Sequence, residues 1–147
     1  MQIDIVSQAD EELYQALKRL IPQLTNNNPP PSLNELAALV RETASTLMIA
    51  RDESGVIVGA LTLAAYRVPS GVRAMIEDVI VDESARGRGI GEALIQRAIA
   101  VAKEKGVGTI ALTSSPFREA ANRLYVRMGF QKRETNAYQL KLNKTAV

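Results

Sequence analysis

The sequence predicts an α/β fold of the α+β type, in which a mixed central sheet of about seven strands is flanked by about four helices. The main observation is that short β-branched runs and segments with helical apolar spacing follow the order β-α-α-β-β-β-α-β-α-β-β. The second is the length of 147 residues, which suits one domain spanning residues 1–147. A chain of this size can bury one sizeable core.

The first third of the chain predicts one strand followed by two helices. Residues 2–6 are rich in β-branched side chains, which are typical of a strand. Residues 11–20 carry leucines at helical spacing, and Asp10 precedes them as an N-cap. Ser32 followed by Glu35 at the third helical position forms a capping box, so a second helix is expected to begin there.

The rest of the chain alternates strands with two further helices. Turn residues at 52–55 separate two β-rich runs and predict a hairpin, and the cations and glycine at 103–106 end a long amphipathic helix. The expected elements are strands at 46–50, 56–66 and 75–81, a helix at 92–102, a strand at 107–113, a helix from Pro116 to about Arg127, and a closing hairpin of 130–133 with 137–142.

The stretch 75–91 carries the main functional signal. A β-branched run is followed by Arg86-Gly87-Arg88-Gly89-Ile90-Gly91 and then by a helix. A helix N-terminus offers unpaired N–H groups and a partial positive charge, and glycines let a phosphate approach the backbone. The two arginines add guanidinium groups that match phosphate oxygens. The pattern therefore predicts an anion site, against the alternative of a glycine-rich turn without ligand.

Two common phosphate motifs do not fit this stretch. A P-loop needs Gly-Lys-Ser/Thr at its end, and the dinucleotide motif G-x-G-x-x-G would need glycine at Glu92 or Leu94. The pattern Arg-x-x-Gly-x-Gly, formed by Arg86, Gly89 and Gly91, resembles the pyrophosphate signature of the GNAT N-acetyltransferase superfamily. The resemblance implies the GNAT fold, acetyl-CoA as co-substrate, and coenzyme contacts from the following residues: Arg86, Gly87, Arg88, Gly89, Ile90 and Gly91.

A second motif lies at residues 121–130, which resemble the family pattern A-x-x-[LF]-Y-x-x-x-G-F. The resemblance implies that Tyr125 lies near the coenzyme sulfur and protonates the leaving thiolate. A phenol with a pKa near 10 can protonate a thiolate whose acid has a pKa near 8.5 at little cost. The alternative is a tyrosine that only packs its ring on the sheet.

One position departs from the family pattern. Many members carry asparagine seven residues before the tyrosine, where this chain has Arg118. Arg118, Asn122 and Tyr125 are expected on one helical face. Asn122 could supply the missing amide contact to the coenzyme and Arg118 could pair with a phosphate, or Arg118 could be a solvated surface charge.

The central strand supplies a candidate base. Strand alternation sends Glu77 and Asp78 to opposite faces, so only one can face an acceptor. Glu77 occupies the place where several relatives hold an acidic residue near the amine, which implies a role as base; a salt bridge or a strand-end charge is the alternative. In relatives this strand is bulged and its backbone pairs with pantetheine, which implies backbone contacts from Val79, Ile80 and Val81, with an N–H near Val79 polarising the thioester carbonyl.

Composition restricts the chemistry. The chain has no cysteine and no histidine, which excludes disulfides, cysteinyl or histidyl intermediates and the usual zinc sites, so no metal is expected. A net charge of +2 argues against nucleic acid and membrane surfaces as partners. No long apolar run and no secretory signal are seen, so a cytoplasmic protein is expected.

The function expected from the resemblance is direct transfer of acetyl from acetyl-CoA to a primary amine of a small molecule or peptide, in a ternary complex. The alternative is a catalytically silent acyl-CoA-binding sensor or partner module. The Asn/Pro segment 26–31 is either a helix linker or a wall of the acceptor site. A homodimer is a further expectation, with the closing hairpin as its interface.

Overall fold

The structure is a computed structural model that describes residues 1–24 and 29–142. Residues 25–28, which include part of the predicted acceptor-site wall, lie outside the described residues. The chain divides into two compact units, Met1–Thr113 and Ser114–Val147. The expectation of a single domain stays a prediction.

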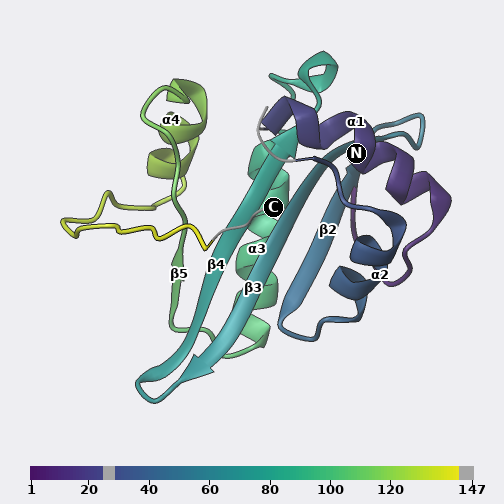
Figure 1. Cartoon of the computed structure of the whole chain (residues 1–147). Helices are drawn as coiled ribbons and strands as arrows, with labels where there is room; N and C mark the ends of the chain where they lie inside the picture. Colours follow the sequence, from purple (N-terminus) through teal and green to yellow (C-terminus); the bar gives the residue numbers. More distant parts are fainter. Residues whose placement is uncertain (25–28, 143–147) are drawn as a thin grey trace. The chain divides into compact units, whose positions relative to one another are not determined.

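The first unit contains the sheet and the first three α-helices. Its elements are β1 (Gln2–Ile5), α1 (Glu11–Leu24), α2 (Leu33–Arg41), β2 (Ser45–Arg51), β3 (Ile57–Val68), β4 (Gly71–Val81), the 3-10 helix η1 (Glu83–Ala85), α3 (Ile90–Glu104) and β5 (Thr109–Ala111). The five strands lie in the order β1-β2-β3-β4-β5, antiparallel except for the parallel pair of β4 and β5 (Figure 1). The mixed sheet is confirmed.

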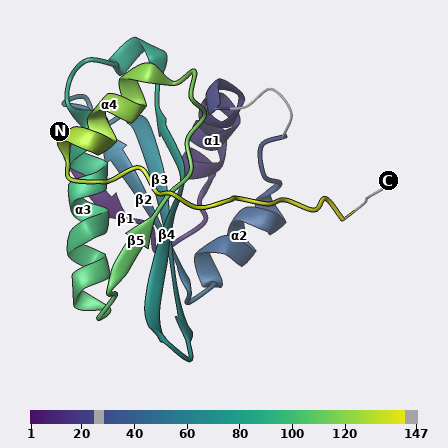
Figure 2. The ribbon, with the colours of Figure 1, turned by 90° about the vertical axis from the view of Figure 1, so that its left-hand side faces the viewer.

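Helices cover both faces of this sheet. Figure 2 shows α3 on one face and α1 and α2 on the other. One buried cluster joins α1 and α2 to the strands, and it includes Leu17, Leu36, Ile49 and Ile80. The buried side of α3 is formed by Ile90, Leu94, Ile95, Ala98, Val101 and Ala102. Apolar burial on both faces explains why the central strands read as nearly continuous hydrophobic runs.

The predicted helix caps are present. The Asp10 carboxylate accepts from the Leu13 N–H at 2.9 Å. Ser32 Oγ accepts from the Glu35 N–H at 3.1 Å, and the Glu35 carboxylate accepts from the Ser32 N–H at 2.8 Å, which completes the capping box. These bonds satisfy N–H groups that the first helical turn leaves unpaired.

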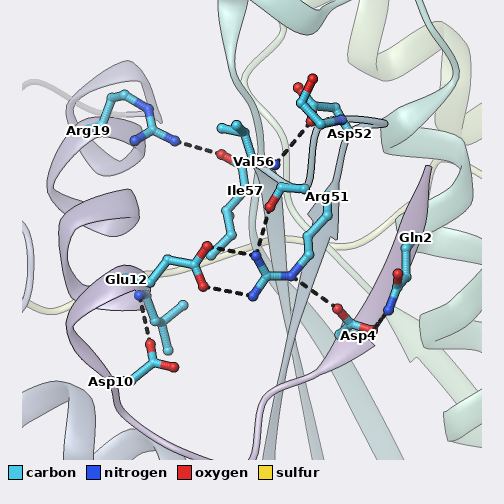
Figure 3. Close-up of polar contacts among 12 residues, drawn as sticks. Gln2, Asp4, Asp10, Glu12, Arg19, Arg51, Asp52, Val56 and Ile57 are labelled. Atoms are coloured by element: carbon cyan, nitrogen blue, oxygen red, sulfur yellow. Dashed lines mark hydrogen bonds and ion pairs between the residues drawn. The ribbon is translucent and has the colours of Figure 1, made fainter.

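An ion-pair cluster around Arg51 joins the N-terminal elements (Figure 3). Its guanidinium donates to both carboxylate oxygens of Glu12, at 2.7 and 2.9 Å, and to Asp4 at 3.3 Å. A further bond of 2.8 Å reaches the Gly55 carbonyl in the turn between β2 and β3. One side chain thus links β1, α1 and this turn.

The strand β4 contains a bulge that sequence alternation did not predict. Ile80 pairs with Ala60 and Glu77 pairs with Thr62, so Asp78 and Val79 together oppose the single residue Leu61. Asp78 has a φ of 52°, in the left-handed region. The extra residue interrupts the alternation of side chains along the strand.

The second unit contains α4 (Glu119–Arg127). The helix begins later than predicted, because the Arg118 N–H closes a separate turn on the Ser115 carbonyl at 3.1 Å, with Pro116 at the second turn position.

The predicted closing hairpin is wrong, because residues 130–142 form no strand. The side chains of Tyr138, Leu140 and Leu142 alternate as in a strand but are exposed. A two-stranded hairpin without further strands is only marginally stable in water, so alternation alone did not suffice. The described chain therefore has five strands and not about seven.

Among the helices of residues 1–24 and 29–142, none combines the length and the apolar character needed to span a bilayer.

Candidate functional site

The loop from β4 to α3 is built on two left-handed glycines. Gly87 has a φ of 81° and Gly89 a φ of 78°. A Cβ atom at either position would meet nothing within 4 Å, so backbone conformation and not space demands glycine there. Both glycines are exposed, and the backbone beside them is open to a ligand.

Gly89 is also the N-cap of α3, and it offers no side-chain cap. The first helical bond runs from the Ala93 N–H to the Gly89 carbonyl at 3.0 Å. The amides of Ile90 and Gly91 precede it and have no acceptor within the helix. The positive end of the helix dipole lies at the same point, which makes this terminus suitable for an anion.

Arg86 directly precedes Gly87 and Arg88 directly precedes Gly89, and both arginines are exposed. Arg86 Nε donates to the Val81 carbonyl at 3.2 Å, and an Arg88 terminal nitrogen donates to the Ser84 carbonyl at 3.4 Å. A guanidinium carries five N–H donors, so each keeps donors beyond these anchoring bonds. Two fixed cations beside a helix N-terminus suit a diphosphate better than a single charge.

The edge of β4 next to this loop is open on one side. Its pairing with β5 covers only Arg73 to Met75, whereas β4 continues to Val81. Within the described residues, Ile80 and Val81 pair with β3 alone, and Val79 lies in the bulge without a partner in the register. An extended ligand can bind such an edge through backbone hydrogen bonds, as an added strand does.

The two carboxylates of β4 are both exposed. Glu77 lies opposite Thr62, which lies opposite Leu47 of the α1–α2 core cluster, so Glu77 belongs to that face of the sheet. Among the described residues, none forms an ion pair with Glu77. The salt-bridge alternative for Glu77 therefore has no support in this structure.

Gly59 was missed from the sequence although it lies under the candidate site. A Cβ atom there would lie 3.1 Å from the Ile80 carbonyl oxygen, 3.1 Å from Ile90 Cγ2 and 3.2 Å from Leu94 Cδ1. The glycine therefore permits the close approach of the first turn of α3 to the sheet. An isolated glycine inside a strand is the signal that could have found it.

In the second unit, Tyr125 is buried on α4. Its ring packs edge-on against Phe130, with centroids 6.0 Å apart and an interplanar angle of 64°. Burial raises the pKa of the Tyr125 phenol, and the nearby charge of Arg118 lowers it in part. The phenol is thereby held in its protonated form, as a proton donor requires.

Arg118 and Asn122 lie one turn apart at the start of α4. The Asn122 N–H donates to the Arg118 carbonyl, which makes Arg118 the N-cap, and the Asn122 side-chain amide donates to the Ser115 carbonyl at 3.0 Å. Arg118 is exposed and influences Tyr125 through its charge. A coenzyme contact from either residue stays a prediction.

The structure thus brings the predicted residues together in two groups. Residues 77–81 and 86–91 form a continuous region of the first unit, and Arg118, Asn122 and Tyr125 form a group of the second. A place for Tyr125 beside the reacting sulfur stays a prediction.

Comparison with known proteins gives the family. The model of the acetyltransferase (GNAT) family matches residues 11–130. The glucosamine 6-phosphate N-acetyltransferase of Trypanosoma brucei brucei is 35% identical over 113 residues, which cover 72% of this chain and 75% of that protein. An uncharacterized N-acetyltransferase of Methanocaldococcus jannaschii is 41% identical over 61 residues, which cover 42% of this chain and only 27% of that protein.

A solved structure agrees. The crystal structure of a Trypanosoma brucei acetyltransferase superposes with a TM-score of 0.76 and 30% identity, covering 96% of this chain and 99% of that chain. The GNAT family uses acetyl-CoA as its co-substrate, and the loop into α3 and the open edge of β4 have the polarity that a diphosphate and a pantetheine arm require. The chain therefore belongs to the acetyltransferase (GNAT) family.

Proposed function

We propose that this enzyme transfers an acetyl group from acetyl-CoA directly to a primary amine, with both substrates bound at once. The observation that carries the proposal is the uncapped N-terminus of α3, which is preceded by two left-handed glycines and flanked by Arg86 and Arg88. The coenzyme diphosphate is bound by the amides of 90–91, and its pantetheine arm runs along the open edge of β4.

In the reaction, the amine nitrogen attacks the thioester carbonyl and the bond between carbon and sulfur breaks. The N–H of Val79, which lies in the bulge and has no partner in the register with β3, stabilises the charge that develops on the carbonyl oxygen. The amine must lose a proton, and for a lysine-like amine at neutral pH this costs about 4–5 kcal/mol. The Glu77 carboxylate accepts that proton directly or through a water, and Tyr125 donates one to the departing thiolate.

For the acceptor we propose an amino sugar phosphate, since the Trypanosoma relative is named for glucosamine 6-phosphate. A screen of free thiol release with acetyl-CoA should compare glucosamine 6-phosphate with glucosamine, polyamines, aminophosphonates, amino acids and peptides. Preference for the phosphorylated sugar supports the proposal. Coenzyme binding without turnover of any amine would instead support a silent acyl-CoA-binding module.

The coenzyme site is tested by calorimetry with two glycine variants. Gly89→Ala should weaken binding of coenzyme A by about tenfold or more, equivalent to about 1.4 kcal/mol, because alanine disfavours the left-handed N-cap. Gly106→Ala is the matched control, since Gly106 ends α3 with a φ of 74° and equally open surroundings. It should lose similar stability, about 1 kcal/mol, but no affinity. Equal affinity in both variants would overturn the proposed site.

A further inference from the structure

The last turns of α1 are bonded to the loop that carries the proposed diphosphate site. Arg19 donates to the Ile57 carbonyl at 2.6 Å, as Figure 3 shows, and to the Asp82 carboxylate at 3.3 Å. Asp82 is the residue that directly follows β4, and its side chain is only 12% exposed. The ion pair therefore fixes the point where the chain leaves the sheet.

Asp82 in turn organises the start of the loop. Its carboxylate accepts from the Ser84 N–H and hydroxyl, each at 3.1 Å, and its own N–H donates to the Val58 carbonyl at 2.8 Å. The carboxylate caps η1, whose backbone bond runs from the Ala85 N–H to the Asp82 carbonyl at 2.8 Å, and η1 ends with the buried Ala85 immediately before Arg86. One buried carboxylate thus sets the direction in which the arginine-glycine segment begins.

Gln23 makes a second bond from α1 to the same loop. Its side-chain oxygen accepts from the Glu83 N–H at 2.9 Å, and its side-chain nitrogen donates to the Arg19 carbonyl at 3.3 Å. The amide therefore bridges the backbone of α1 and the backbone of η1. Since Arg19 and Gln23 lie one turn apart, they contact two adjacent residues of the loop, Asp82 and Glu83.

We propose that Arg19 and Gln23 are positioning residues for the coenzyme: by holding Asp82 and Glu83, they fix the loop that presents Arg86 and the first amides of α3 to the diphosphate. The inference rests on the proposed acetyl-CoA site. Gly87 and Gly89 allow the second half of the loop more than one backbone conformation. The geometry of the loop therefore depends on how firmly its first half, beginning at Asp82 and Glu83, is held. Neither residue touches the coenzyme in this proposal.

The test compares Gln23→Met with Gln15→Met. Gln15 is the matched control, because it lies on the same helix and, among the residues that the structure describes, its side chain bonds only Glu11 of that helix, at 2.7 Å. With acetyl-CoA as donor, Gln23→Met should raise KM by about threefold to tenfold, the equivalent of one net hydrogen bond, and leave kcat nearly unchanged. With acetyl-pantetheine, which lacks the diphosphate, both variants should match the wild-type protein.

Hydrogen exchange supplies a readout that does not depend on turnover. In the coenzyme-free protein, amides of residues 82–91 should exchange faster in Gln23→Met, and coenzyme A should restore part of their protection. Gln15→Met should leave this segment unchanged. Arg19→Met should act like Gln23→Met. Arg51→Met breaks the ion pairs of β2 with Glu12, near the start of α1, and with Asp4. It should lower the Tm without changing exchange in residues 82–91.

Three results would overturn the inference. If Gln23→Met equals Gln15→Met in KM and exchange, α1 does not position the loop. If Gln23→Met impairs the two donors equally, its role is general stability. If the wild-type protein does not bind coenzyme A, the proposed function fails as well, so this last result is distinguishable from the first two.

Discussion

Tyr125 is the residue whose environment best fits a chemical task. Its side chain is 7% exposed, and burial raises the pKa of its phenol. Tyr125→Phe should therefore lower kcat by about 10²-fold or more, with coenzyme affinity retained. Because the pKa of this phenol is raised from its ordinary value, kcat of the wild-type enzyme should not fall between pH 7 and 9 through loss of this proton.

Tyr66→Phe serves as the control, since Tyr66 is a partly exposed tyrosine of β3 in the first unit. It should leave kcat unchanged. An unaltered kcat in Tyr125→Phe would remove this tyrosine from the mechanism and leave it a packing role against Phe130.

The ionisation of the Asp82 carboxyl makes the stability of the folded state depend on pH. The Ser84 N–H first, then the Ser84 hydroxyl and Arg19, hold the pKa of Asp82 below its ordinary value against the effect of burial. A carboxyl with a lowered pKa in the folded state stabilises that state above its unfolded pKa, near 4, and this contribution is lost as pH falls through the folded pKa. Asp82→Asn should lower the Tm at pH 7, and the difference from the wild-type protein should shrink below pH 4. An equal difference at pH 7 and pH 3 would contradict the assignment.

At the scale of elements, the bulge in β4 shows the difference between features that a segment's own residues predict and features that depend on pairing with a neighbouring strand. The β-branched run predicted the strand, but the bulge arises from the register with β3, so only the family resemblance and not the residues of β4 predicted it. Asp78 adopts the left-handed conformation, which Asp tolerates better than β-branched residues do. The continuation of helix α1 past Pro22 to Leu24 was also not predicted from the sequence. Proline inside a helix carries a local energetic penalty, which packing of the helix overrides here.

The bulge gives a prediction for Asp78. Asp78→Gly should preserve the bulge, with a stability close to that of the wild-type protein and full acetyl transfer. Asp78→Val should lose about 1–3 kcal/mol in the free energy of unfolding and also lose transfer, because valine resists a φ of 52°. Chemical unfolding and thiol release measure the two effects. Loss of transfer in both variants, with stability kept in Asp78→Gly, would assign the Asp78 carboxylate a role of its own.

At the scale of the whole molecule, the sequence predicted most of the element order correctly. Capping residues, turns and apolar spacing are local, and they located the elements from β1 to α4 along the chain. The glycine-rich loop before α3 was also readable, because left-handed glycines and a helix start have a compact signature; its binding of a diphosphate stays a prediction. Pairing is not local, so the pattern at 137–142 predicted a strand that the described chain does not contain. The bonds from Arg19 and Gln23 to the loop join residues about sixty positions apart, which no spacing rule reveals.

The exposed tail leads to a prediction about assembly. Tyr138, Leu140 and Leu142 are 90%, 84% and 80% exposed, and exposed apolar side chains at alternate positions offer a surface that a partner can cover. We expect the protein to form a homodimer through this segment, because a second copy supplies the apolar cover that these side chains lack. Sedimentation should show a dimer for the wild-type protein and a monomer for Leu140→Asp. Val56→Asp alters a single apolar side chain that is 48% exposed, and should leave the dimer intact. A monomeric wild-type protein, or a dimeric Leu140→Asp, would contradict an interface at this segment.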